Sequence, residues 1–508
     1  MKWAILLLAV SASWAGIGTP ILLDLTNRST VTRTGSVVLA GVPIPEAAAV
    51  TDVRNLAITT APSNACAGGV NIDSHRLVTE RWHGDPTDTS KNIKWVLVAI
   101  AAPTLAGSAV AHVCLSDRSG ADPGTATVVT INSSDACADS TACTTISTGV
   151  NRYWIRHDYF NLFDQVRRIS DSHDYVTHST SGGITAVTSA GTFTSATAPT
   201  AMPGIPGYTV TTEEPSGSST VNEDGASLWA QVKVSGALWN GSTPKFTYVG
   251  RLFFFGGDGA WLWKGTNIYS EDMFAAANQP TSVGLFIPTT FGASLTATFG
   301  TVYGAGGTTS AVSMANTDDV WLSQYDHGNT VSNTAPTIGG TASASAPWYV
   351  CNDIGAQNTA TAATGENDCG GLNLSGFRIV KGATTQTTGS QSDGWMGLDD
   401  GTNQANVWMR DNWQNYPMEI EAHGDTIAVY QWPKHGDTHV DGRSTGDLTS
   451  IVNYKRDMAL AGQTGFGHFW PWTPGAAMNG SVVVVVGMVA AIEARLAANQ
   501  LCGPLVRS

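Results

Sequence analysis

Charged residues are scarce in this sequence: only 13% of its 508 residues are Asp, Glu, Lys or Arg. Surface helices are normally built from Glu, Lys, Arg, Leu and Ala, so this scarcity argues against a helical protein. Lys and Arg number 26 against 40 Asp and Glu, which gives a net charge of −14, and the basic residues form no cluster. We therefore expect no nucleic-acid partner, because such a chain repels a phosphate backbone.

Several motifs are also missing from the sequence. It contains no Gly-x-Ser-x-Gly elbow, phosphate loop, His-Glu-x-x-His or Cys-x-x-Cys, which leaves serine hydrolases, nucleotide enzymes and zinc sites without support. The apolar run at 481–492 is shorter than the roughly 20 residues of a membrane-spanning helix, so it predicts a buried strand or core helix. We expect no metal site and no cofactor; Ca²⁺ is chemically compatible with the acidic loops, but no motif supports it.

Glycine and tryptophan are abundant, with 55 and 17 residues, and Thr and Ser are frequent. This composition predicts an all-β protein. Short Val- and Ile-rich runs over 20–115 predict a small β-barrel, and residues 116–150 read as a linker with a Cys-clipped loop. Longer aromatic runs, such as those at 227–239 and 246–255, predict a large antiparallel β-sandwich over 151–440. The remainder, 441–508, is expected to be partly helical, with candidate helices at 447–462 and 489–500.

The sequence also points to an extracellular or cell-surface location. Residues 1–15 have Lys2, an apolar segment and small residues at Ser13 and Ala15, as in a signal peptide. Seven cysteines suit an oxidising compartment, where Cys137/Cys143 and Cys351/Cys369 could form local disulfides and Cys502 would be left over. In the alternative, several of the seven are free buried thiols; they lie at 66, 114, 137, 143, 351, 369 and 502.

Two stretches carry a resemblance to a known family. The first is VVLAGVPIPEAAAV (37–50) with TERWHGDPTDTSKNIKWVLV (79–98); the second is WMRDNWQNYPMEIEAHGDTIAVYQWP (408–433). Together they resemble the rhamnogalacturonan exolyase and YetA-like proteins, whose RIFT barrel carries a Gly-Val-Pro-x-Pro strand and whose central β-sandwich has a Trp-Gln-x-Tyr-Pro segment. Two differences stand out: the loop 85–92 is longer than in the family, and the α/α toroid that follows in the family has no counterpart here.

The resemblance implies a secreted protein that acts on, or binds, an extracellular polysaccharide, with β-elimination as the reaction if it is an enzyme. If the family's toroid contributes to the active site, this chain keeps the scaffold without the lyase. The alternatives are a non-catalytic structural protein of a surface layer, fibre or virion, which could self-assemble, and a lectin-like adhesin. Low charge and Thr, Ser, Gly and Ala content suit the structural alternative.

The densest group of candidate site residues lies between 407 and 436. If residues 410–416 form a strand, Arg410, Gln414 and Tyr416 project from one face, and with Trp432 beside them they could bind a sugar. In the competing interpretation, Arg410 forms a local ion pair with its neighbour Asp411 and the Trp residues only pack. The acid, base and cation that a lyase needs could come from the same region, namely Arg410, Tyr416, His423, Lys434, His435 and His439.

Other parts of the sequence offer weaker candidates. Trp261 and Trp263 share one face of a strand and predict either a sugar platform or a packed pair. His157 and His327 are further catalytic candidates. His-Gly-Asp at 423–425 lies between two alternating runs and predicts a hairpin turn, and the His- and Asp-containing segment 435–443 predicts a solvated loop.

Overall fold

The computed structural model confirms an all-β protein. It describes residues 17–27, 32, 35, 37–62, 65–178, 181–199, 201–214, 219–268, 280–301, 309–324, 377–389, 392–409, 412, 418–424 and 426–435; at 266–268, 337–338, 341–342, 431–432, 445–456 and 482–486 it describes the backbone alone. Within these residues the helical content is two short 3-10 turns, η1 (Glu46–Ala48) and η2 (Val53–Asn55). A separate short hairpin joins β23 (Thr337–Ile338) and β24 (Thr341–Ala342).

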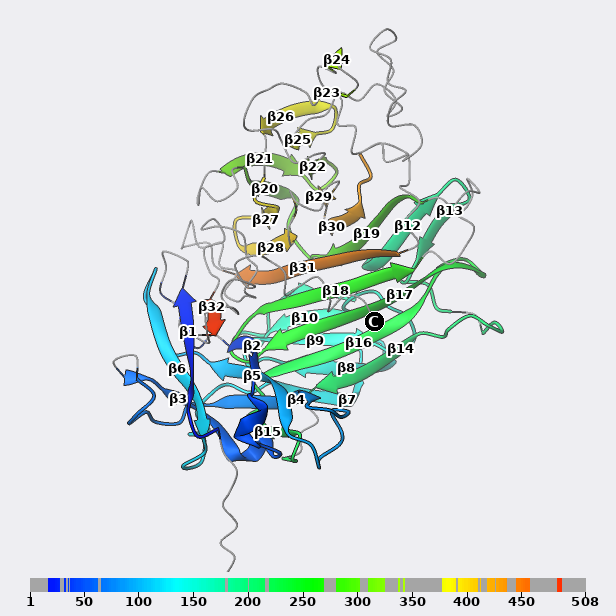
Figure 1. Ribbon diagram of the computed structural model, residues 1–508. Helices are drawn as coiled ribbons and strands as arrows, with labels where there is room; N and C mark the ends of the chain where they lie inside the picture. The colour runs from blue at the N-terminus through cyan, green and yellow to red at the C-terminus, as the bar shows by residue number, and fades with distance from the viewer. Residues whose placement is uncertain are drawn as a thin grey trace, which may run out of the picture.

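The first module consists of two four-stranded antiparallel sheets around a core of its own. Six of its eight strands come from the first 117 residues, where the sequence predicted a small β-barrel. Alternate residues such as Leu23, Leu25, Val96 and Val98 point into this core and are fully buried. One sheet has the order β3 (Leu56–Thr60), β6 (Val110–Asp117), β1 (Ile21–Asn27), β32 (Val482–Val486). The other has the order β15 (Glu223–Gly225), β4 (Ser74–Arg81), β5 (Ile93–Ala101), β2 (Val37–Pro43). Two strands of this barrel, β15 and β32, therefore come from distant parts of the chain (Figure 1).

The linker prediction for 116–150 is wrong over its second half. Residues 130–147 form two strands of a five-stranded sheet, in the order β11 (Asp174–Val176), β10 (Gln165–Arg168), β9 (Asn151–Arg156), β8 (Ala142–Ser147), β7 (Thr130–Ala136). Strand β7 is mostly exposed and so lacks the apolar pattern of a buried strand. The disulfide Cys137–Cys143 closes the turn between β7 and β8, as predicted, and a second disulfide, Cys66–Cys114, joins residues far apart in the sequence. Cys351, Cys369 and Cys502 lie outside the described residues.

A network of seventeen hydrogen-bonded strands forms the sandwich. The strand pairings resolve into two antiparallel runs joined where β13 meets β16. One run is β14 (Thr209–Glu214), β16 (Trp229–Asn240), β17 (Thr243–Phe255), β18 (Ala260–Ile268), β31 (Thr445–Arg456), β28 (Asn403–Met409), β27 (Trp395–Asp399), β20 (Ser294–Gly300), β21 (Thr309–Ala315). The other is β13 (Gly191–Thr194), β12 (Gly183–Thr188), β19 (Pro280–Pro288), β30 (Thr426–Trp432), β29 (Met418–His423), β22 (Asp319–Gln324), β25 (Phe377–Lys381), β26 (Thr384–Gly389).

The helix predicted at 447–462 is wrong, because residues 445–456 form strand β31. This strand pairs with β18 on one side and with β28 on the other, so its backbone completes the sheet between them. Such pairing overrides the local sequence preference from which a helix was predicted. The apolar run at 481–492 contributes strand β32, in line with the strand alternative, and the candidate helix at 489–500 lies outside the described residues.

Strands β16–β18 carry apolar side chains on both faces. Val232, Val234 and Phe254 belong to the large core of the sandwich, which also includes residues of the five-stranded sheet. Trp229 and Phe253 lie on the opposite face, where they pack with Val37 and Ala99 of the barrel. The barrel therefore covers part of this face of the sandwich (Figure 1).

No helix among the residues that the structure describes has the length and apolar character needed to cross a membrane.

Candidate functional site

Most of the predicted sugar-binding row falls outside the part of the chain that the structure describes. Arg410, Gln414 and Tyr416 of that row lie outside the described residues, and so does the separate catalytic candidate His327. The backbone of Trp432 is described at the end of β30, but its side chain is not. The hairpin predicted at 423–425 is confirmed, because β29 and β30 pair directly across it. Gly424 lies in its turn with φ of +57°, a conformation that favours glycine.

Trp261 and Trp263 face the same side of β18, as predicted, but they point into the sandwich core. Their exposed fractions are 0% and 2%. Trp261 contacts Phe163 edge to face at 4.9 Å between ring centroids, and Trp263 stacks on Phe160 at 5.6 Å. Neither ring has a face open to a dissolved polysaccharide, so the pair corresponds to the packing alternative and not to a sugar platform.

His157 follows β9 and is half-buried on the five-stranded sheet. Its Nε2 lies 2.8 Å from Oγ1 of Thr144, and its backbone N–H donates to the carbonyl of Ala142. Burial lowers the pKa of His157, and the nearby carboxylate of Asp158 opposes this shift only partly. A neutral imidazole is the form that could act as a base. Among the described residues, its side-chain hydrogen bond is to Thr144, which is not a predicted site residue.

A cluster of ionisable side chains lies on β29 and β30, partly where the sequence predicted a catalytic constellation. Glu421 is buried; its Oε2 accepts a hydrogen bond from the Tyr430 hydroxyl at 2.6 Å and its Oε1 accepts one from Nζ of Lys434 at 2.8 Å. Glu419 is also buried and binds Nδ1 of His435 at 2.9 Å and the hydroxyl of Ser323. The two glutamates thus fasten the segment 433–435 onto the sheet.

The pKa shifts in this cluster keep its donors protonated. Burial raises the pKa of Tyr430, and the charge of Glu421 raises it further. Burial alone would lower the pKa of Lys434, but the hydrogen bond and charge of Glu421 outweigh it and raise the pKa. A protonated Tyr and a protonated Lys that are bound to a buried carboxylate are poor bases. The cluster therefore holds the segment 433–435 on the sheet and does not serve as a proton acceptor.

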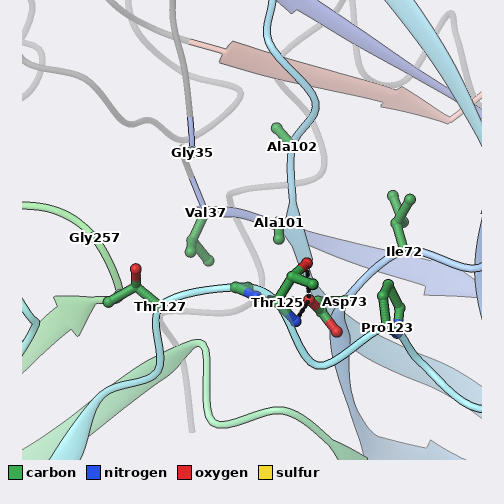
Figure 2. A pocket seen from close by; sticks show the side chains of 12 residues that line it. Gly35, Val37, Ile72, Asp73, Ala101, Ala102, Pro123, Thr125, Thr127 and Gly257 are labelled. Carbon is green, nitrogen blue, oxygen red and sulfur yellow. Dashed lines mark hydrogen bonds between the residues drawn. The ribbon is translucent and has the colours of Figure 1, made fainter.

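A cavity of about 380 Å³ lies where the barrel meets the sandwich. Figure 2 shows Gly35, Val37 and Ala101 on one side, Thr125 and Asp73 on another, and Thr127 beside Gly257. The walls combine small side chains, the apolar Val37 and Ile72, and the hydroxyls of Thr125 and Thr127. These residues come from five separate stretches of the chain, and the lining is Gly35, Val37, Ile72, Asp73, Ala101, Ala102, Pro123, Thr125, Ala126, Thr127, Gly256 and Gly257.

Asp73 holds one wall of the cavity in place. Its carboxylate accepts hydrogen bonds from the backbone N–H groups of Gly124, Thr125 and Ala126 at 2.6–2.7 Å, and from the Thr125 hydroxyl at 3.1 Å. Burial alone would raise the pKa of Asp73, but these hydrogen bonds outweigh it and lower the pKa below its usual value. Asp73 is therefore an anionic clamp for the loop 124–126.

Gly256 allows the floor of the cavity to form. A Cβ atom at this position would lie 2.0 Å from the carbonyl oxygen of Thr127, which is far too close. Any other residue would push the 125–127 segment away from the β17–β18 turn. The sequence interpretation missed this cavity, and only the glycine pair at 256–257 marked a place where two backbones approach closely.

The chain matches no protein-family model, and no curated protein matches it either. Among solved structures it is similar to an alpha-mannosidase from Enterococcus faecalis V583, with a TM-score of 0.44 and 9% identity, over 86% of this chain and 43% of that one. A glycosyl hydrolase family 38 protein from Enterococcus faecalis gives a TM-score of 0.42 and 8% identity, over 86% of this chain and 45% of that one.

The galactosidase domain of alpha-galactosidase-sucrose kinase, AgaSK, gives a TM-score of 0.30 and 7% identity, over 64% of this chain and 42% of that one. The chain thus spans less than half the length of each of these three. At these scores the similarities carry no argument about function. The resemblance to rhamnogalacturonan exolyases stays a prediction.

Proposed function

We propose that the protein binds extracellular carbohydrate and holds one neutral sugar unit of a polysaccharide in the cavity between barrel and sandwich. The cavity itself carries this proposal. At about 380 Å³ it falls within the roughly 300–1,000 Å³ of small-molecule sites, which occur preferentially between domains. The two disulfides support an extracellular setting, because disulfides persist in oxidising compartments.

The chemistry of the walls supports a sugar as the occupant. Val37, Ile72 and the alanines can cover the C–H face of a pyranose ring, while the hydroxyls of Thr125 and Thr127 can exchange hydrogen bonds with its hydroxyl groups. Among the described residues that line the cavity, Asp73 is the only charged one, and its charge is negative. A uronate carboxylate would be repelled, so the sugar unit we propose is neutral.

Binding is favoured over β-elimination by the state of Asp73. A lyase needs a base to remove a proton beside a carboxylate and a cation to neutralise the resulting charge. Asp73 is the only titratable residue among the described residues of the lining, and its low pKa makes it a weak base whose oxygens are already engaged. The part of the lining that the structure describes offers no Lys, Arg or His to serve as the cation.

Affinity electrophoresis tests this proposal. Three separate gels contain a neutral galactan, a rhamnogalacturonan or polygalacturonate, and the migration of the protein is measured in each. Thr127→Trp places a large ring at the exposed edge of the cavity, whereas Val128→Trp adds the same ring at the next position, which does not line it. We expect a neutral or mixed polymer to slow wild type and Val128→Trp but not Thr127→Trp. Equal retardation of the two variants, or retardation by polygalacturonate alone, contradicts the proposal.

A structural role is the second candidate, and the interlocked modules favour it. Strand β15 is supplied by the sandwich segment of the chain yet completes a barrel sheet, and β32 completes the other. Because these strands tie distant parts of the chain into the barrel, the two modules are held together as one unit. A rigid unit of this kind suits a component of an assembly. Filaments or lattices in negative-stain microscopy, with no retardation in any polymer, would favour this alternative.

A further inference from the structure

Three ionisable side chains meet where barrel and sandwich join, away from the cavity. Glu214 ends sandwich strand β14, Glu223 begins β15, and His75 lies on barrel strand β4. One ligand atom from each lies within 4.8 Å of the others. His75 and Glu223 are buried and Glu214 is half-buried. The group is therefore shared between the two modules.

Hydrogen bonds fix the tautomer of His75. The indole Nε1 of Trp229, which can only donate, points at Nδ1 of His75 at 3.0 Å. Nδ1 must therefore carry a lone pair, and the ring proton is on Nε2. From there it is donated to Oε1 of Glu223 at 2.9 Å. His75 is thus a neutral imidazole with both nitrogens satisfied.

This tautomer argues against a metal ion at the group. A metal bound to Nε2 would move the ring proton to Nδ1, where it would face the N–H of Trp229. Two donors would then oppose each other in a buried site. A metal ion on Nε2 of His75 would therefore break the bond to Trp229, whereas a proton on one of the two carboxylates leaves that bond intact.

Glu214 is the residue with room for that proton. Its Oε2 is buried and has no hydrogen-bond partner among the residues that the structure describes. Burial raises the pKa of Glu214 to about 7, with further contributions from the charges of Glu223 and Glu213. Protonation gives Glu214 an O–H that can be donated toward the neighbouring carboxylate.

The cations near this group are committed to other carboxylates. Arg251 on β17 donates to Glu213 at 2.7 Å, and Lys233 on β16 lies 3.9 Å from the same glutamate. On β4, Arg76 pairs with Asp224 at 2.7 Å. The described residues therefore offer an ionised Glu214 no cation of its own to offset the repulsion from the charge of Glu223.

We propose that Glu214 and Glu223 share one proton, and that this proton helps to fasten β15 to the barrel. Loss of the proton leaves two adjacent carboxylates at the junction. Their repulsion loosens β15, whose neighbourhood is held by backbone bonds from Val78 to Asn222 at 2.8 Å and from Ala226 to Ser74 at 3.0 Å. The contact between β15 and the barrel would then be more stable at acidic pH than at alkaline pH.

The direction in which stability changes with pH follows from the linkage between proton binding and folding. The ordinary pKa of a Glu is 4.5 here and the folded value is about 7, so the folded protein binds the proton more tightly than the unfolded chain. The contribution of Glu214 is fully present below about pH 4.5 and is lost as the pH rises through about 7.

Hydrogen exchange tests the proposal through the amides of Val78 and Ala226, with rates corrected for the intrinsic effect of pH. We expect their protection factors in the wild type to fall about tenfold between pH 5.5 and pH 8, since each pKa unit is a factor of ten. Glu214→Gln, a neutral match for the protonated acid, should abolish this fall. Glu46→Gln is the control: its carboxylate pairs with His83 at the surface and does not contribute to the pKa of Glu214, so the fall should remain.

Two outcomes overturn the proposal: a pH-independent protection factor in the wild type, or the same fall in Glu214→Gln as in the wild type. An infrared spectrum gives a second reading that does not depend on exchange. At pH 6 the wild type should show the C=O stretch of a buried protonated carboxylic acid, and folded Glu214→Gln should lack it. The same band in both proteins also overturns the assignment.

Discussion

Trp229 donates its indole N–H to Nδ1 of His75 at 3.0 Å, so a sandwich strand and a barrel strand share a buried hydrogen bond. Both side chains are almost completely buried. The same contact sets the tautomer of His75 and hence its bond to Glu223. The indole N–H of Trp229 thus fixes the hydrogen bonds that join Trp229, His75 and Glu223 across the junction of the two modules.

Replacing Trp229 with Phe should destabilise the protein more than the same change at another buried Trp. Trp229→Phe leaves Nδ1 of His75 buried and unpaired, which costs roughly 1–3 kcal/mol beyond the loss of packing. Trp261→Phe is the control, because the indole nitrogen of Trp261 has no partner among the described residues. Urea unfolding of both variants measures the difference, and an equal loss of stability would show that the bond to His75 contributes little.

Lys434→Met should lower stability through Glu421. The change leaves a buried carboxylate with Tyr430 but without its cation, and such a loss costs several kcal/mol when both partners are buried. The Lys434 side chain is 41% exposed, so we expect about 1–3 kcal/mol. Lys381→Met removes a Lys of similar exposure, 35%, from a half-exposed pair with Asp318. It should lower the free energy of unfolding by under about 1 kcal/mol. An equal effect of the two changes would contradict a stabilising role of the ion pair between Lys434 and Glu421.

Asp73→Asn should destabilise the protein at neutral pH by about 1.5–3 kcal/mol, because hydrogen bonds from three backbone N–H groups end on its carboxylate. The folded pKa of Asp73 lies below its ordinary 3.8, so its contribution is present above that value and is lost as the pH falls through the folded pKa. The difference in unfolding free energy between wild type and variant, measured by chemical denaturation, should therefore be smaller at pH 2.5 than at neutral pH. A difference of the same size at pH 2.5 and at neutral pH would contradict the role of the charge.

Local sequence signals predicted the strands well and the junctions poorly. The alternating runs at 227–239 and 246–255 correspond to β16 and β17, and the spacing of Cys137 and Cys143 predicted their disulfide. The strand at 445–456 could not be predicted locally, because its conformation depends on β18 and β28 at its two sides. The disulfide Cys66–Cys114 joins residues 48 positions apart, and no local spacing marks it.

The candidate sites were hard to predict for the same reason. The cavity needs Asp73, Thr125 and Gly256 to meet, and these residues are far apart in the sequence. The density of polar and aromatic residues around 407–436 did mark Glu421, Tyr430 and Lys434 as a region of interest. What the sequence could not show is that the charges of Glu421 and Lys434 are already paired with each other in the fold.

The central claim, that a neutral sugar unit binds in the junction cavity, is tested most directly by methyl NMR of alanine-labelled protein. Ala101, Ala102 and Ala126 line the cavity, whereas Ala186, Ala405 and Ala422 are buried in the sandwich core and serve as references. Titration with oligosaccharides from the polymer that retards the protein should shift the first three signals in a saturable way and leave the references unchanged. Saturable shifts elsewhere, with the three cavity alanines unmoved, would contradict the account.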